Sequence, residues 1–174
     1  GFPLHKLSVY IGPEKYNKKK YFEKEDLMIV SPDYHPQKLV FLNLVSKQLP
    51  NLKIRIIKNL TYEEYKEVIS RAKWALTFGE GLDGYFLETI LSGGISFAVY
   101  NTIFFTKDFK SLRTVYNNYD LLINNICLDI KDIDNEIAYN DYQGKQYELC
   151  CRYYNYKKYI NNLELFYKGN YTYK

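Results

Sequence analysis

Cysteine, methionine and tryptophan are scarce in this sequence, and long apolar runs are missing from it. Among 174 residues there are three cysteines, one Met and one Trp. The cysteines (Cys127, Cys150 and Cys151) form no CxxC pair and no Cys/His cluster, which argues against a zinc site. No apolar run approaches the roughly 18–20 residues that a helix needs to cross a bilayer. We therefore expect a reduced, cytoplasmic protein without a bound metal, in which the cysteines are small core residues.

The charge balance is mildly basic and excludes few classes of ligand or partner. Apolar residues make up 47% of the chain and aromatic residues 18%, so a single domain with a sizeable core is expected. The net charge is +4, with acids and bases interspersed. Such a balance suits an anionic small ligand or an anionic membrane surface, and it selects neither.

Short apolar runs alternate with helical patterns over residues 26–99. The runs that predict strands lie at 26–30, 52–57, 74–78 and 95–99. Between them lie an apolar stripe closed by two prolines (36–50), a helix with a capping-box start (61–72) and a helix stopped by two glycines (85–91). Strands that alternate with helices in this way predict a parallel sheet covered on both faces.

The remainder of the chain, from about residue 118, has helical patterns. We therefore expect an α/β fold: a Rossmann-like, doubly wound parallel sheet with helices on both faces and a helical C-terminal tail. The domain is expected to occupy residues 27–174, after a polar, lysine-rich lead-in over residues 1–26. No linker and no internal repeat is visible.

The stretch from Gly79 to Glu88, GEGLDGYFLE, joins the third predicted strand to the next helix. In open α/β sheets ligands bind beyond the carboxyl ends of the strands, and this loop lies at such an end. A glycine-rich turn lets the backbone approach a ligand, and the helix start offers free N–H groups to an anion. Glu80 and Glu88 can face the same crevice, where carboxylates are good acceptors for sugar hydroxyls.

The segment resembles the donor site of the GT-B retaining glycosyltransferases, family four in particular. The likeness lies in Glu80 and Glu88, separated by seven residues, and in Ser92-Gly93-Gly94 before a strand. That family has roughly E-G-F-G-x-x-x-x-E-A-x-x-x-G there, and the likeness covers 27–99. The resemblance implies a Rossmann-like domain that binds a nucleotide-sugar. It further implies that Glu80 contacts hydroxyls of the donor sugar and that Glu88 contacts the ribose. The backbone around Gly81 and Leu82 would approach the sugar and phosphates.

A second element of the resemblance follows the first predicted strand. The family usually has an Arg there, and about five residues later a Lys, which together clasp the diphosphate. Lys38 matches the Lys, whereas Pro32 or Asp33 occupies the place of the Arg. His35 either supplies a substitute hydrogen bond or is an ordinary loop histidine.

The glycine turn departs from the family pattern at one place. Asp83 stands where the family has its second Gly, and Gly84 follows one position later. Aspartate tolerates the left-handed backbone conformation better than most residues, so the turn can be kept. Because a carboxylate repels a diphosphate, we expect Asp83 to point away from the phosphates and toward sugar or acceptor hydroxyls.

The resemblance implies a complete enzyme that moves a sugar from a nucleoside diphosphate sugar to a hydroxyl, with retention and without a metal or other cofactor. Glu80 and Lys38 are then the candidate catalytic residues, and Glu88, Gly81, Leu82, Asp83, Gly84 and His35 the candidate donor-binding residues. The expected partners are the nucleotide-sugar and an N-terminal acceptor-binding half. A bacterial polysaccharide or glycolipid pathway at the inner face of the membrane is the expected setting.

Three other interpretations compete with this one. The missing Arg and the altered turn favour a non-catalytic binding or assembly module that keeps the fold. A flavodoxin-like or receiver-like domain is disfavoured, because no acidic cluster or phosphate loop follows the first strand. The Tyr- and Lys-rich segment 152–159 resembles a nucleic-acid stacking surface, but a helix packed on the sheet explains it better, so no nucleic-acid partner is expected.

Overall fold

A five-stranded, all-parallel sheet forms the centre of the computed structural model, which describes residues 2–7, 11–12 and 15–173. Its strands are β1 (Glu25–Val30), β2 (Lys53–Ile56), β3 (Ala72–Leu76), β4 (Ile95–Val99) and β5 (Val115–Tyr116), in the order β2-β1-β3-β4-β5. Each neighbouring pair is parallel. The predicted Rossmann-like α/β fold is confirmed.

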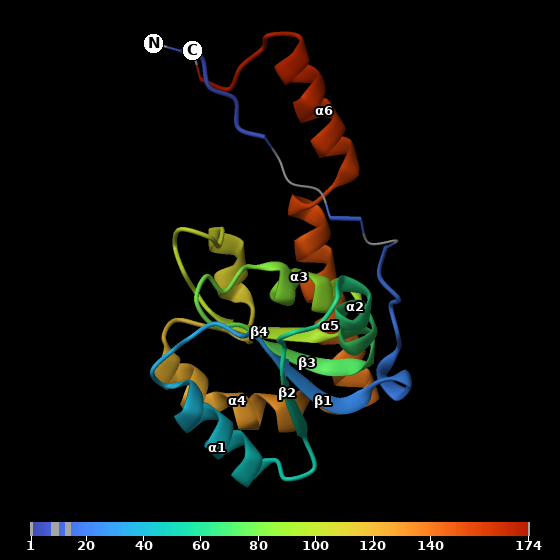
Figure 1. Ribbon diagram of the computed structural model, residues 1–174, viewed down its shortest axis with the longest axis vertical. Helices are drawn as coiled ribbons and strands as arrows, with labels where there is room; N and C mark the ends of the chain where they lie inside the picture. The colour runs from blue at the N-terminus through green and yellow to red at the C-terminus, as the bar shows by residue number, and fades with distance from the viewer. Residues whose placement is uncertain (1, 8–10, 13–14, 174) are drawn as a thin grey trace.

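Helices cover both faces of this sheet (Figure 1). One face carries α1 (Lys38–Gln48) and α4 (Tyr119–Ile133), and the other carries α2 (Tyr62–Arg71) and α3 (Gly84–Leu91). The long α5 (Glu136–Tyr153) contacts β4 and both α3 and α4. Two short 3-10 helices, η2 (Tyr21–Glu23) and η3 (Lys107–Ser111), complete the body.

Successive residues of β1 pack into opposite layers, as the two-residue period of a strand requires. Met28 and Val30 lie in one apolar cluster with Phe41 of α1. Ile29 lies in another with Ile69 of α2. All of these side chains are buried, and this explains why β1 appears in the sequence as a continuous apolar run.

The strand order reverses at β1, which has β2 on one side and β3 on the other. Ligands of doubly wound sheets bind beyond the carboxyl ends of the strands at such a reversal. The loops after β1 and β3 therefore flank the expected ligand position. The same order occurs in flavodoxin-type sheets, although the loop after β1, SPDYHPQ, contains no glycine.

Strand β3 starts two residues earlier than predicted and ends at Leu76. The reason is Lys73, a charged residue that is nevertheless buried within the strand. Its ammonium lies 2.5 Å from a carboxylate oxygen of Asp26 and 2.9 Å from one of Asp134. Thr77 and Phe78, predicted as strand, begin the following loop and stay buried.

The segment ahead of β1 packs on the body. Lys18 and Lys20 are exposed, as expected of a lysine-rich lead-in, but Lys24 is buried. Its ammonium donates to the backbone oxygens of Ser70 and Ala72, at 3.0 Å each. Burial lowers the pKa of Lys24 to about 7.

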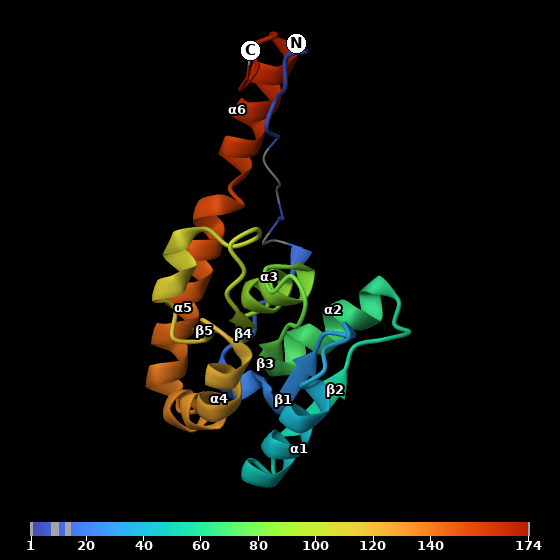
Figure 2. The ribbon, with the colours of Figure 1, turned by 90° about the vertical axis from the view of Figure 1, so that its left-hand side faces the viewer.

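The predicted helical tail is confirmed by α4, α5 and α6 (Tyr156–Tyr167). Helix α6 extends away from the sheet, and the two ends of the chain lie beside it (Figures 1 and 2). An antiparallel bridge joins Leu4 to Tyr173 there. Within the described ranges, no helix has both the length and the apolar character to cross a membrane. Cys127 and Cys150 are buried and unpaired, as expected of core residues.

Candidate ligand-binding site

The loops after β1 and β3 meet at the carboxyl edge of the sheet. The N–H of Ser31 donates to the carbonyl of Leu76, and the Ser31 hydroxyl oxygen accepts from the N–H of Phe78, at 3.0 Å in both cases. Asp33 lies against Gly79, where an added Cβ would sit 3.7 Å from the Asp33 Cβ. The two sequence segments that carry the predicted site are therefore neighbours in the fold.

The turn between β3 and α3 depends on glycine geometry. Gly79 and Gly81 have φ angles of +72° and +80°, which side chains rarely adopt. A Cβ at Gly81 would also lie 2.7 Å from the Phe105 ring and 2.9 Å from the carbonyl oxygen of Val99. Next in the chain, Leu82 is half-buried against the apolar cluster around α3, so its side chain serves packing.

Asp83 is the N-cap of α3. Its carboxylate accepts from the N–H of Phe86 at 2.9 Å, which satisfies one of the free donors of the helix start. Burial raises its pKa to about 7, with a further contribution from the nearby carboxylates of Asp33 and Glu80. The carboxylate therefore lies at the N-terminus of α3, and its expected orientation relative to a bound diphosphate stays a prediction.

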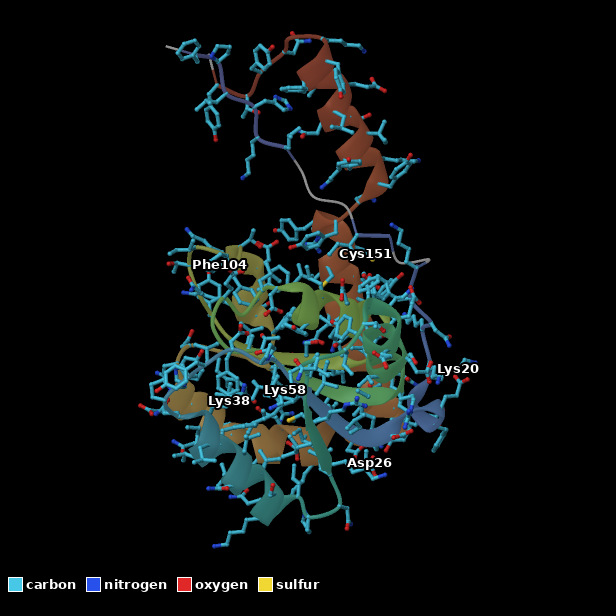
Figure 3. The ribbon with its side chains drawn as sticks, in the orientation of Figure 1. Lys20, Asp26, Lys38, Lys58, Phe104 and Cys151 are labelled. Carbon is cyan, nitrogen blue, oxygen red and sulfur yellow. The ribbon has the colours of Figure 1, made fainter. Side chains whose placement is uncertain are left out.

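The ammonium of Lys38 is occupied within its own loop. It donates to the backbone oxygens of Ser31, at 2.5 Å, and Asp33, at 2.9 Å, and lies 5.4 Å from the centre of the Phe78 ring. Burial lowers its pKa, while the Asp33 carboxylate acts in the opposite direction. Lys38 is thus at the predicted edge, at the start of α1 (Figure 3), and holds the loop after β1 in shape.

His35 belongs to an aromatic stack. Its ring lies 3.7 Å from that of Tyr119 and 5.5 Å from that of Phe78, measured between ring centres. Its Nδ1 accepts from the N–H of Gln37 at 3.2 Å. Burial lowers its pKa, which favours the neutral imidazole at pH 7.

A cavity of about 540 Å³ opens at the carboxyl edge, against β1, β2 and the start of α3. Two of the predicted site residues, Gly84 and Glu88, line it. The other lining residues come from the loops after β1 and β2 and from α2 and α3: Pro32, Ile57, Lys58, Asn59, Leu60, Thr61, Tyr62, Tyr65 and Tyr85. Glu80 is exposed in the neighbouring turn and does not line this cavity.

Tyrosine hydroxyls surround the Glu88 carboxylate. Tyr16 donates to Oε1 of Glu88 at 2.8 Å, and the Tyr62 hydroxyl lies 3.1 Å from that of Tyr16. The Tyr65 hydroxyl is buried and has no hydrogen-bond partner in the part of the chain that the structure describes. Burial and the nearby Glu88 carboxylate raise the pKa of Tyr65 well above its usual value.

A smaller hollow of about 270 Å³ lies on the other side of the glycine turn. It is lined by Gly79, Val99, Tyr100, Asn101, Thr102 and Tyr119. The glycine turn thus separates two hollows, one beside Glu88 and one beside the end of β4.

The sequence analysis missed the residues after β2 and the tyrosines. Lys58 to Tyr62 follow a strand end, so the rule that pointed to Glu80 would have pointed to them as well. Figure 3 labels Lys58 just after β2, whereas Lys20 and Asp26 lie toward the opposite end of β1 from Lys38. The sequence around Tyr16 does not predict a role at the site, because Tyr16 and Glu88, which are in contact, lie 72 positions apart in the chain.

In the described part of the chain, no group of three or more His, Cys, Asp or Glu residues is arranged to hold a metal ion.

No family model matches the chain. No curated protein matches it either. Among solved structures, the chain is similar to TarM, a glycosyltransferase of the GT-B type, with a TM-score of 0.63 and 14% sequence identity. The likeness covers 90% of this chain and 38% of the TarM chain. It shows that the two chains share a fold over this length.

Proposed function

We propose that this chain is the nucleotide-sugar-binding domain of a glycosyltransferase of the GT-B type. The observation that carries the proposal is the 540 Å³ cavity beside the strand reversal, with the Glu88 carboxylate, from the second turn of α3, in its wall. Small-molecule sites typically span about 300–1,000 Å³, with mainly apolar walls and few polar groups. The fold likeness to TarM supports the same conclusion.

The residue roles follow from this position. Glu88 would accept hydrogen bonds from ribose hydroxyls in the cavity, while apolar and aromatic walls such as Ile57 and Leu60 would take the base. Glu80, exposed in the glycine turn, would orient the donor sugar outside the cavity. The diphosphate would then lie between them, at the N-terminus of α3.

The reaction needs positive partial charge at this point, because the leaving diphosphate gains negative charge in the transition state. The free N–H groups at the start of α3, Lys38 at the start of α1 and Lys58 in the loop after β2 are the groups that would supply it. Transfer with retention of configuration, to an acceptor hydroxyl held by a second half of the enzyme, completes the proposal. A bacterial polysaccharide or glycolipid acceptor at the membrane surface belongs to the same proposal.

A second candidate, a binding or assembly module without activity, is favoured by two observations. The Asp83 carboxylate accepts from one of the N–H groups at the start of α3, and the Lys38 ammonium donates to two backbone oxygens. Both features weaken the field that a diphosphate requires. A chain that binds another polypeptide stably and no nucleotide would fit this second candidate.

Calorimetry with Glu88→Ala and Glu80→Ala separates the assigned roles. Titration with uridine and guanosine diphosphates and their glucose conjugates should show that Glu88→Ala weakens both kinds of ligand by roughly 10- to 100-fold, the usual value of a hydrogen bond to a charged group. Glu80→Ala should spare the free diphosphate and weaken only the sugar conjugate.

Glu148→Ala, a change at an exposed carboxylate of α5, is the control and should leave both affinities unchanged. A Glu80→Ala variant that loses as much affinity for the free diphosphate as for the sugar conjugate, as is expected of Glu88→Ala, would contradict the assignment.

A further inference from the structure

Tyr16, in the segment ahead of β1, contacts Glu88 in the wall of the cavity. This residue is 8% exposed, and its hydroxyl makes the 2.8 Å hydrogen bond to Glu88 Oε1. A phenol has one proton to donate. Since Tyr16 gives its proton to Glu88, the neighbouring Tyr62 hydroxyl, 3.1 Å away, must donate to the Tyr16 oxygen. The three groups form a directed relay, from Tyr62 through Tyr16 to the carboxylate.

The relay fixes the orientation of a carboxylate that would otherwise rotate. Glu88 lies in the second turn of α3. With Oε1 held by Tyr16, the second oxygen, Oε2, is the one that we assign to a ligand. Hydrogen bonds to a charged acceptor are roughly twice as strong as those between neutral groups, so the orientation is well determined.

The buried Tyr65 hydroxyl supplies an independent observation. It lines the same cavity from α2 and lies close to the Glu88 carboxylate, but among the described residues it makes no hydrogen bond of ordinary geometry. An unsatisfied buried hydroxyl is costly, and native structures retain few of them. A bound hydroxyl group next to Glu88 would satisfy it.

We propose that Tyr16 is a positioning residue of this cavity, which fixes Glu88 so that Oε2 and the Tyr65 hydroxyl together bind the adjacent hydroxyl groups of a ribose. This inference rests on the proposed function and adds a selectivity to it: the site distinguishes ribonucleotides from nucleotides that lack these hydroxyls. A site built around hydrogen bonds to a ligand hydroxyl rejects analogues without it, because its own polar groups are then left unpaired.

Tyr16→Phe tests the inference, with Tyr116→Phe as a matched control. Tyr116 lies on β5, outside this cavity, and is 7% exposed. Its hydroxyl donates to a carboxylate oxygen of Asp129 at 2.6 Å. Both changes remove one hydroxyl from a buried tyrosine that donates to a carboxylate. The comparison therefore separates positioning at the cavity from a general loss of stability.

The affinities of uridine and guanosine diphosphates and of their 2′,3′-dideoxy analogues are measured by calorimetry for the unchanged chain and both variants. The unchanged chain should prefer the ribonucleotide. Tyr16→Phe should lower the affinity for the ribonucleotide about tenfold and that for the dideoxy analogue less than threefold, which reduces the preference. Tyr62→Phe, which removes the first donor of the relay, should give a smaller loss in the same direction.

Two outcomes would overturn the inference in distinguishable ways. If Tyr16→Phe weakens both analogues equally, or changes their ratio no more than Tyr116→Phe does, the nucleotide site stands and the positioning role is wrong. If the unchanged chain binds neither ribonucleotide, the proposed function fails and this inference fails with it.

Discussion

Asp83 gives the sharpest test of the site's electrostatics, because it caps a helix from a partly buried position. Its pKa is raised from 3.8 to about 7. Between these values the folded state binds more protons than the unfolded state, so this group makes the protein less stable as pH rises from about 4 to 7. The shift is about 3 units, and each unit corresponds to about 1.4 kcal/mol, which gives an upper limit of about 4 kcal/mol. Solvent screening of a partly exposed carboxylate reduces the expected value to about 1–2 kcal/mol.

Asp83→Asn removes the charge and keeps an oxygen that can accept from Phe86, since Asn and Asp cap helices equally well. The two chains should be about equally stable near pH 4. The Asn variant should be more stable by about 1–2 kcal/mol at pH 8, by the reasoning that links a raised pKa to stability. Urea unfolding at both pH values measures this difference as a shift of the midpoint.

The control is Asn118→Asp, at the exposed N-cap of α4, whose side chain accepts from the N–H of Leu121. A carboxylate in water at a helix start is not desolvated and is stabilised by the helix dipole, so this change should not destabilise the protein at pH 8. A gain for Asp83→Asn that is the same at pH 4 and pH 8 would refute the argument from burial.

Three further changes test the glycine turn and the buried lysine. Gly84→Ala adds a Cβ 3.8 Å from the carboxyl carbon of Glu88, which is an ordinary contact, so the free energy of unfolding should change by less than about 1 kcal/mol. Calorimetry should show the affinity for nucleoside diphosphates falling roughly tenfold. An unchanged affinity would mean that the ligand lies elsewhere. Gly81→Ala forces a positive φ and a 2.7 Å contact with the Phe105 ring, so urea unfolding should show a loss of about 2–4 kcal/mol; a loss below 0.5 kcal/mol would disprove the need for glycine. Because the pKa of Lys24 is lowered, the unchanged chain should become more stable as pH rises from about 7 toward 10. Lys24→Met should abolish this rise in the free energy of unfolding, measured by urea titration at each pH. Stability that depends on pH in the same way in both chains would contradict the prediction.

The layers of the fold could be predicted because each depends on local pattern. The capping box at Thr61, for example, is present as predicted, with the hydroxyl of Thr61 accepting from the N–H of Glu64. The start of β3 was missed because Lys73 carries its charge into the strand and pairs with carboxylates far away in the chain. The two-residue β5 is too short to leave a pattern.

The candidate site was predictable only where it depends on strand ends. Gly84 and Glu88 line the cavity, as a loop after a buried strand suggests. Tyr16 and Tyr65 could not be inferred, because their proximity to Glu88 depends on how the lead-in and α2 pack on α3. The engagement of Lys38 by its own loop is likewise a consequence of backbone geometry that the sequence does not reveal.

Thermal unfolding of the chain with uridine, guanosine, thymidine and adenosine diphosphates tests the central claim, that the cavity beside Glu88 binds a nucleoside diphosphate. At 100 times the dissociation constant, binding adds about 2.7 kcal/mol of stability, or roughly 5–10 °C in the unfolding temperature of a domain of this size. We expect saturable stabilisation by one base, lost in Glu88→Gln. The absence of a shift with every base at millimolar concentration, or an equal shift in Glu88→Gln, would contradict the claim.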